Sequence, residues 1–191
     1  GLTTSAFQVS TTEGGSAVTT TGSQSGVHTG TSNPVLPTSY DAFRRLGSII
    51  RAGGAIRAFV QDGDMFMWTA TGILDVNTTN PGTSAVTVTL SVPVGMQVRA
   101  LVHAGFFDTS GSEGGLLLSD LALTDVAPVS RTATQGQVMT RPIASGNQSG
   151  GALFIRTNTA AQIRYRSELS GAGTIVTLAI VGWAARRGQD N

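Results

Sequence analysis

The fold of this chain is indicated most clearly by residues 43–68, FRRLGSIIRAGGAIRAFVQDGDMFMW. Two turn-forming sequences, Ala52-Gly53-Gly54 and Asp62-Gly63, divide this stretch into three segments rich in apolar residues. Both turns contain residues that tolerate a positive φ, which the twisted turns of β-hairpins require. The stretch therefore predicts three β-strands joined by two tight turns.

The same alternation of strands and turns continues through the rest of the chain. Residues 84–90 alternate apolar and hydroxyl side chains, which indicates a strand with one buried face. Residues 96–107 predict a strand whose apolar face consists of Met96, Val98, Ala100 and Val102. Residues 116–126 fit either a strand or a short helical turn, and residues 128–150 are expected to be mostly loop. Three final strands, which should pair as an antiparallel meander, are expected at residues 152–157, 161–168 and 174–183.

These features predict an all-β protein. No stretch shows sustained helical periodicity with capping residues, and the frequent Thr and Val favour a pleated sheet. Short intervals between strands, marked by Gly, Pro and Asn, are typical of an antiparallel β-sandwich, here expected to be jelly-roll-like. A β-barrel is the structural alternative. The sandwich domain is expected to comprise residues 33–191 and to begin with the extended sequence Asn33-Pro34.

Residues 1–32 form a compositional segment of their own. Residues 19–26, TTTGSQSG, contain no large apolar side chain, so they cannot bury enough surface to offset the entropy of ordering. The segment is therefore expected to be an extended, Thr/Ser/Gly-rich N-terminal arm or linker. Two interpretations remain open: a flexible linker, and an arm that is ordered by contact with another subunit.

The composition argues against several classes of function. The 191 residues include twelve basic residues, all of them arginine, and eleven acidic residues, for a net charge of +1. Charge-driven binding of nucleic acid needs an excess of basic residues on one face, so no nucleic-acid partner is expected. The absence of cysteine excludes disulfides and thiol catalysis. The longest apolar run, residues 175–185, is too short to cross a bilayer, so no membrane insertion is expected.

The two histidines and the glycine-rich loops offer little chemistry. His28 lies in the arm and is expected to be solvated. His103 lies in a predicted strand, out of phase with the apolar face, and is expected to be a surface or hydrogen-bonded core residue rather than a catalytic base. The glycine-rich loops lack a lysine and do not lead into a helix, so no nucleotide site is expected. No other cofactor and no metal site are expected.

Asp62 and Asp64 are the nearest approach to a pair of carboxylates. They flank a tight turn, where aspartate is favoured because it hydrogen-bonds to its own backbone. A structural role is therefore expected, with calcium binding and glycosidase-like catalysis as the alternatives. Asp120 and Asp125 are similarly expected to cap a helix or stabilise a turn. Since no catalytic residue is assigned, the chain is expected not to be an enzyme.

The arginines are more informative about surfaces. Arg164 and Arg166 are two residues apart in a predicted strand, so their side chains leave the same face of the sheet. A solvated sheet face is the default interpretation. The alternative is an interface in which the guanidinium groups pair with carboxylates or carbonyls of another subunit. Further arginines at or near predicted strands are Arg44, Arg45, Arg156, Arg186 and Arg187.

Four aromatic side chains in predicted strands are expected to pack between the two sheets: Phe59, Phe66, Trp68 and Trp183. Exposed tryptophan and tyrosine also form carbohydrate-binding platforms. Aromatic residues make up only 6% of this chain, which leaves few for a surface role. A core role is therefore the prediction.

Seven short motifs occur in order along the chain: PVLPTSY (34–40), RRLGSI (44–49), FVQDGD (59–64), DVNTTNPG (75–82), LSD (118–120), VGW (181–183) and RRG (186–188). Each is weak alone, but in this order and spacing they resemble bacteriophage and prophage tail-fibre-like proteins. The resemblance covers residues 33–188 and does not extend into the arm before Ser32.

This resemblance implies a non-enzymatic structural protein of the bacteriophage virion, located in a tail fibre or tail tip. Such proteins are usually homo-oligomers, very often trimers, and their distal domains bind host-surface glycans or proteins. The implied partners are further copies of this chain, other virion proteins and a host surface. A capsid decoration or head-fibre protein is the alternative, and a polysaccharide depolymerase using Asp62 and Asp64 is a third hypothesis. Loops carry function more often than strands, so Asp108–Gly115 and Thr140–Gly150 are the expected binding loops.

Overall fold

The structure is a computed structural model that describes residues 8–13, 16–21, 50–52, 55–110, 114–129, 137–141 and 147–185. In these residues every regular element is a β-strand, and every strand pair is antiparallel. The predicted all-β fold is therefore confirmed. The chain divides into two compact units, Gly1–Ile49 with Arg187–Asn191, and Ile50–Arg186. The predicted boundary between residues 32 and 33 lies outside the described residues.

The first unit contains one described β-hairpin. Strands β1 (Gln8–Glu13) and β2 (Ser16–Thr21) pair antiparallel, from Gln8 opposite Thr21 to Glu13 opposite Ser16. Several β-branched residues in both strands suit extended backbone. The hairpin falls within the segment predicted to be an arm or linker, and the other residues of that segment lie outside the described part of the chain.

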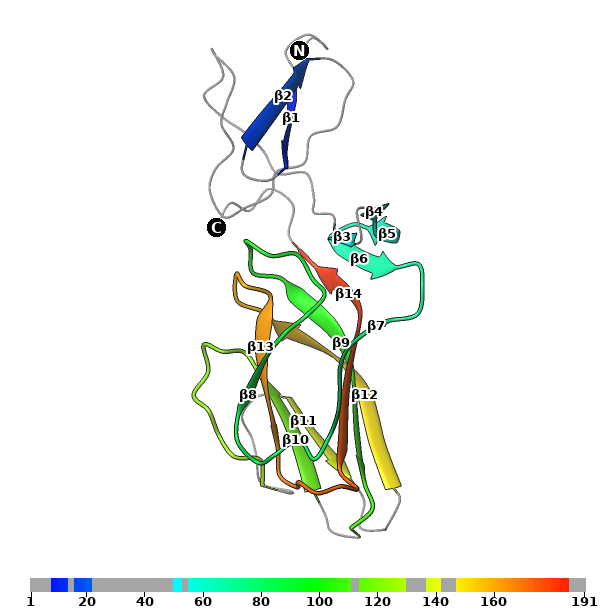
Figure 1. Cartoon of the computed structure of the whole chain (residues 1–191), viewed down its shortest axis with the longest axis vertical. Helices are drawn as coiled ribbons and strands as arrows, with labels where there is room; N and C mark the ends of the chain where they lie inside the picture. Colours follow the sequence, from blue (N-terminus) through cyan, green and yellow to red (C-terminus); the bar gives the residue numbers. More distant parts are fainter. Residues whose placement is uncertain are drawn as a thin grey trace. The chain divides into compact units, whose positions relative to one another are not determined.

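Two antiparallel sheets form most of the second unit (Figure 1). One has the order β12-β9-β14-β6-β5, with β7 pairing to β14 next to β6. Its strands are β5 (Phe59–Asp62), β6 (Met65–Trp68), β7 (Ile73–Thr79), β9 (Arg99–Asp108), β12 (Asn147–Arg156) and β14 (Ile175–Ala184). The other has the order β11-β10-β13-β8 and consists of β8 (Val86–Thr89), β10 (Gly114–Ser119), β11 (Gln137–Arg141) and β13 (Gln162–Ser167). A two-stranded ribbon, β3 (Arg51–Ala52) with β4 (Ala55–Ile56), precedes them.

The strands from β7 to β14 have the topology of a jelly roll. Their pairs are nested along the chain: β7 with β14, β8 with β13, β9 with β12, and β10 with β11. This nesting is the pattern of one long antiparallel hairpin. Rolling that hairpin up adds the pairs β9 with β14 and β10 with β13, and produces two sheets that face each other. The predicted jelly-roll-like sandwich is therefore confirmed.

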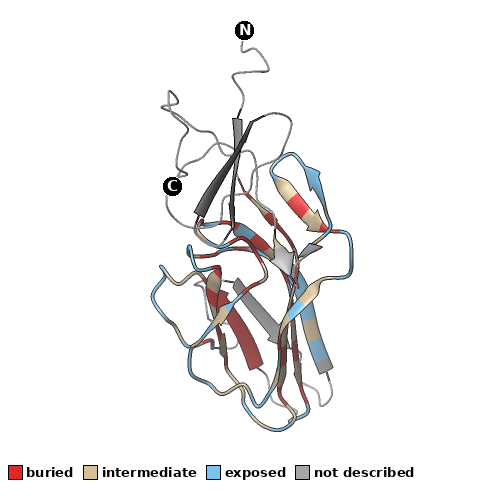
Figure 2. Cartoon of the chain, turned by 45° about the horizontal axis from the view of Figure 1, so that its top comes forward, coloured by how far each residue is buried: buried red, intermediate tan, exposed pale blue. Residues whose placement is uncertain are grey.

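One continuous hydrophobic core lies between the sheets (Figure 2). Side chains alternate between buried and accessible along β13 and most of β14, as expected for strands with one face in the core. The six-stranded sheet contributes Phe106 and Leu178, and the four-stranded sheet contributes Leu118 and Ile163, each at most 1% exposed. The predicted apolar face is confirmed, because all four of its residues are buried: Met96, Val98, Ala100 and Val102.

The predicted meander of the last three strands is wrong. β12 pairs with β9, β13 lies in the other sheet between β10 and β8, and β14 pairs with β9, β7 and β6. The connections after β12 and after β13 therefore cross from one sheet to the other. Each of these strands has an apolar face that either sheet could bury, so the local pattern does not specify a partner. The sheet in which each strand lies is determined by its pairing with strands that are far away along the chain.

The prediction that residues 128–150 are mostly loop is wrong for β11 and for the first half of β12. Their backbones pair with β10 and β9 over Gln137–Arg141 and Asn147–Gly150. In β11 the two apolar residues, Val138 and Met139, are adjacent, and residues 147–150 are all small or polar. Neither segment therefore shows the apolar alternation that predicts a strand. The ambiguous segment 116–126 is strand only as far as Ser119, after which the chain turns.

The opening stretch contains four short strands rather than three, since residues 57 and 58 interrupt the second predicted strand. Asp62 pairs with Met65, which makes Gly63 and Asp64 the central residues of the turn, one position later than predicted. Gly63 has a φ of 57°, a conformation in which glycine is favoured. Residues 43–49 lie outside the described part of the chain.

Tyr165 is a titratable residue of the core. It lies in β13, is 4% exposed, and burial raises the pKa of its hydroxyl above the ordinary value of 10.0. The folded state therefore keeps the proton to a higher pH than the unfolded state does. We expect the free energy of unfolding to fall as the pH rises above 10.0, through the raised pKa.

Urea denaturation at about pH 9 and about pH 11 measures this effect, because the pair brackets the ordinary tyrosine pKa. In Tyr165→Phe the loss of stability between these two conditions should be smaller than in the wild type. Equal losses in the two proteins would contradict a contribution from Tyr165.

Candidate functional site

Two connections at one end of the sandwich enclose a shallow hollow of about 370 Å³. It is lined by residues 108–110, at the end of β9, and by residues 169–174, between β13 and β14. The two segments meet because β9 ends beside the start of β14, with Phe107 opposite Ile175. The hollow borders the predicted binding loop Asp108–Gly115, of which residues 111–113 lie outside the described residues.

Asp108 links the two sides of the hollow. Its side chain is buried, with the residue 2% exposed. Thr174 Oγ1 donates to Asp108 Oδ1 at 2.7 Å, and the backbone N–H of Ser110 donates to Asp108 Oδ2 at 2.9 Å. The Ser110 hydroxyl donates to the same Oδ2. A carboxylate buried at this depth is stabilised by such donors, so Asp108 is a structural residue that fixes both segments.

The segment between β13 and β14 is also tied to the connection after β7. Ser170 Oγ accepts the backbone N–H of Gly82 at 2.9 Å and donates to Asn80 Oδ1 at 2.6 Å. The backbone N–H of Asn80 donates to the carbonyl of Thr174 at 3.0 Å. These bonds join residues 80–82 to residues 170–174, and Thr174 is also bonded to Asp108 on the other side. The segment between β13 and β14 is therefore held from both sides.

The accessible surface of the hollow carries no exposed charged side chain and combines apolar atoms with hydroxyl groups. Thr109, Ser110 and Ser170 are exposed there and carry hydroxyl groups, and Ala172 is exposed beside them. Hydroxyl groups donate and accept hydrogen bonds, as do the hydroxyls of a sugar. The carboxylate of Asp108 lies beneath this surface, bound to its own loops. The arrangement therefore suits recognition of a neutral polar ligand.

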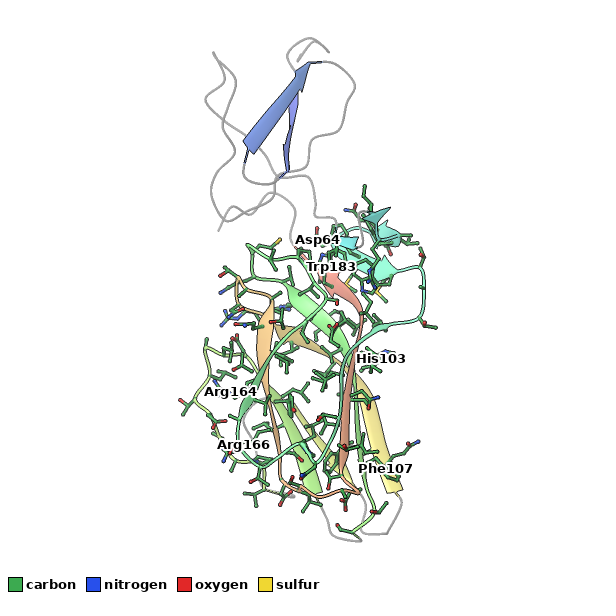
Figure 3. All side chains as sticks on the ribbon, viewed as in Figure 1. Asp64, His103, Phe107, Arg164, Arg166 and Trp183 are labelled. Carbon is green, nitrogen blue, oxygen red and sulfur yellow. The ribbon has the colours of Figure 1, made fainter. Side chains whose placement is uncertain are left out.

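The predicted carboxylate pair lies at an exposed hairpin turn. Asp62 ends β5 and Asp64 occupies the following turn, and both are exposed. Within the described residues, no group of three or more His, Asp or Glu side chains is placed to hold a metal ion. Asp62 and Asp64 lie at the predicted hairpin, but Asp64 is one of the two central turn residues and does not flank the turn as predicted. His28 lies outside the described residues, and His103 is exposed on β9, facing away from the core (Figure 3).

The two arginines of β13 contact a segment of their own chain. Arg164 donates to the carbonyl of Leu123 at 3.1 Å and to the carbonyl of Leu121 at 3.3 Å. Arg166 Nη1 donates to Asp125 Oδ2 at 2.7 Å. Both side chains leave the same face of the sheet, as predicted (Figure 3). The carbonyls and the carboxylate that they bind lie in residues 121–125, which therefore cross the outer side of this sheet.

Asp120 stabilises a turn, as predicted. Its Oδ1 accepts the backbone N–H of Ala122 at 2.9 Å, and its Oδ2 accepts Arg156 Nε. The Arg156 side chain is 50% exposed, so this ion pair contributes little to stability. The remaining predicted arginines, Arg44, Arg45, Arg186 and Arg187, lie outside the described residues. So do residues 142–146 of the predicted loop Thr140–Gly150.

The four predicted core aromatics form one cluster around Trp183. Its ring stacks on Phe66, with centroids 5.0 Å apart, and lies 4.9 Å from Trp68 and 6.1 Å from Phe59. Phe66, Trp68 and Trp183 are buried, and Phe59 packs against the core while partly buried. Their predicted core role is confirmed. No described segment is an apolar helix long enough to cross a membrane.

The sequence matches no protein-family model and no curated protein.

Sequence reasoning located the loop that borders the hollow but missed Asp108 and Thr174 as the residues that build it. The spacing Asp108-x-Ser110 is a local signal, because aspartate readily accepts a hydrogen bond from the backbone two residues later. Thr174 lies 66 residues away, and nothing local to it indicates this partner.

Proposed function

We propose that this chain is a structural protein of a bacteriophage virion, a tail-fibre or tail-tip component that assembles with copies of itself and attaches to a host surface. The observation that supports attachment best is the hydroxyl-rich hollow, which two connections form at one end of the sandwich. The seven ordered motifs point to the same class of virion protein. Jelly rolls also occur in viral capsid and lectin domains, a fold-level analogy that favours the proposal.

The expected ligand class for the hollow is a glycan of the host surface. Neutral hydroxyls on an exposed rim form individually modest hydrogen bonds, each contributing about 1 kcal/mol. A single hollow would therefore bind weakly. Several copies in one assembly would raise the overall strength of attachment without any further contact, because the second binding event becomes intramolecular.

Binding of the full chain to an array of bacterial capsule and lipopolysaccharide glycans tests this proposal. Ala172→Arg places a large side chain at the exposed rim of the hollow and should weaken binding at least about tenfold. Ala160→Arg is the matched control, since Ala160 is also exposed but lies in the connection after β12, at the other end of the sandwich. The control should bind like the wild type. Failure of the wild type to bind any glycan, or equal binding by both variants, would refute attachment through the hollow.

Antibody labelling of virions from the bacterium that carries the gene tests the location. Label on the tail is the expected result. Label on the head would replace the proposal with its alternative, a capsid decoration or head-fibre protein. Release of reducing ends from bound glycan would favour the depolymerase hypothesis, whereas intact glycan is expected.

A further inference from the structure

The two sheets of the sandwich differ in how their outer sides are covered. On the four-stranded sheet, Arg164 and Arg166 hold residues 121–125 across the outer side. Leu117, which lies opposite Arg166 in the neighbouring strand, is only 3% exposed although it is outside the core cluster between the sheets. The outer side of this sheet is therefore covered by the chain itself at β10 and β13, whereas Thr87 and Thr89 of the edge strand β8 are exposed.

On the six-stranded sheet, no segment among the described residues is bound across the outer side of β9 or β12 in this way. Along these strands every side chain that points away from the core is at least partly accessible. We define the outer face as the outward side of β12, β9, β14 and β7. Its main apolar side chains are Leu74, Leu101, Phe107, Ala152, Phe154 and Ala179.

The centre of the outer face is largely apolar and carries no Asp, Glu or Arg side chain. Phe154, 44% exposed, lies opposite Leu101, and Ala152 lies opposite His103, which is the only ionisable side chain in the middle of the face. Gly105 lies opposite Gly150 in β12, and the side chain of Thr177 in β14 lies over Gly105. The charged residues Arg99 and Arg156 lie opposite each other in neighbouring strands at one end of the face. An apolar centre with a charged margin is the usual composition of a protein–protein interface.

The size of the outer face matches self-association. β9, β12 and β14 each contain ten residues and are therefore ~33 Å long, and together with β7 they form a surface ~19 Å wide. The footprint is on the order of 600 Å², so two such faces together bury on the order of 1,200 Å². That total reaches the lower end of the range of stable interfaces. Monomeric proteins rarely leave apolar patches of more than a few hundred Å² exposed.

We infer that a second copy of this chain covers the outer face in solution. This inference rests on the proposed function, because it assigns a surface to the self-association that the proposed function includes. Like faces are complementary here, because an uncharged apolar centre meets the same centre on the other copy. Arg99 and Arg156 then remain at the margin, where their guanidinium groups stay hydrated.

Sedimentation velocity of the full chain at micromolar concentration tests the inference. The wild type should sediment as an assembly of two or more subunits. Ala152→Glu adds a carboxylate to the centre of the outer face, where Ala152 is exposed, and should weaken the association at least ~100-fold, because one carboxylate from each copy would lose its hydration there with only the His103 imidazole beside it. Val94→Glu is the matched control: Val94 is 66% exposed and lies between β8 and β9, outside the sheets. It should leave the assembly unchanged.

A monomeric wild type would overturn the inference. An Ala152→Glu protein that keeps the wild-type assembly would also overturn it, since another surface would then hold the subunits together. Far-UV circular dichroism establishes that both variants keep the β-sheet spectrum. Neither measurement involves a virion or a glycan, so a negative result leaves the tests of location and attachment to be decided separately.

Discussion

Trp183→Ala is expected to lower the free energy of unfolding by about 3–5 kcal/mol. Trp183 is 0% exposed and contacts three other aromatic rings, of which Phe66 is stacked on it with an interplanar angle of 4°. Its removal loses the transfer free energy of a large ring and leaves a cavity that the surrounding strands cannot close. It also removes the residue that joins β14 to the hairpin of β5 and β6 through side chains.

Urea denaturation followed by far-UV circular dichroism measures this loss without depending on tryptophan fluorescence, which the substitution itself changes. Trp183→Phe is a graded comparison, because it keeps an aromatic ring and removes a buried indole N–H that has no hydrogen-bond partner. It should lose clearly less stability than the alanine variant. Val94→Ala, at an exposed position, should change stability by no more than about 0.5 kcal/mol. A loss at Trp183→Ala as small as that at Val94→Ala would contradict a central role for the cluster.

Gly182→Ala is expected to cost about 3 kcal/mol, at the upper end of the usual penalty for overpacking. A Cβ at Gly182 would overlap the carbonyl oxygen of Phe66 and would lie 3.1 Å from Met67 Cα, both of them backbone atoms. The two strands must therefore separate. β6 pairs with β14 at only three positions, from Met65 opposite Ala184 to Met67 opposite Gly182, so a small separation disrupts the whole contact.

Gly150→Ala is the matched control for this prediction. Gly150 also lies in a strand of the six-stranded sheet, but its nearest neighbour to a new Cβ is the carbonyl oxygen of Ala104 at 3.5 Å, an ordinary contact. Its free energy of unfolding should stay within about 0.5 kcal/mol of the wild type. Thermal or urea denaturation of both variants checks the difference. Equal free energies of unfolding for Gly182→Ala and Gly150→Ala would contradict the prediction, because β6 would then accommodate the new methyl group without loss of stability.

Much of the strand content could be predicted from local pattern. Residues 96–107 alternate so regularly that the buried face was assigned residue by residue, and Gly63 marked a turn to within one position. β11 could not be found in this way, because Gln137–Arg141 has no clear alternation and depends on backbone pairing with β10. The order of the strands in the two sheets could not be predicted either. β12, β13 and β14 follow one another along the chain, yet none of them pairs with the next.

The candidate functional surfaces could likewise be predicted only in part, since local pattern places a residue in a loop or on a strand face but does not identify its distant partners. The loop after Asp108 is predicted as a binding loop because loops carry function more often than strands, but the hollow exists only because Thr174 approaches Asp108 in the folded chain. Arg164 and Arg166 were correctly assigned to one face of a strand. Their carbonyl and carboxylate partners could not be identified, since residues 121–125 reach them by crossing the sheet.

The sequence by itself determined that this chain is all-β, where most of its turns lie, and which side of the long strand β9 is apolar. These properties depend on residues two to four positions apart, whose side-chain alternation and turn conformations are local. Only the tertiary structure decided which strands pair, which loops build the hollow, and that the six-stranded sheet leaves its outer face open while the other is covered. Each of these depends on contacts between residues tens of positions apart, such as Ile175 with Thr79, which local pattern does not encode.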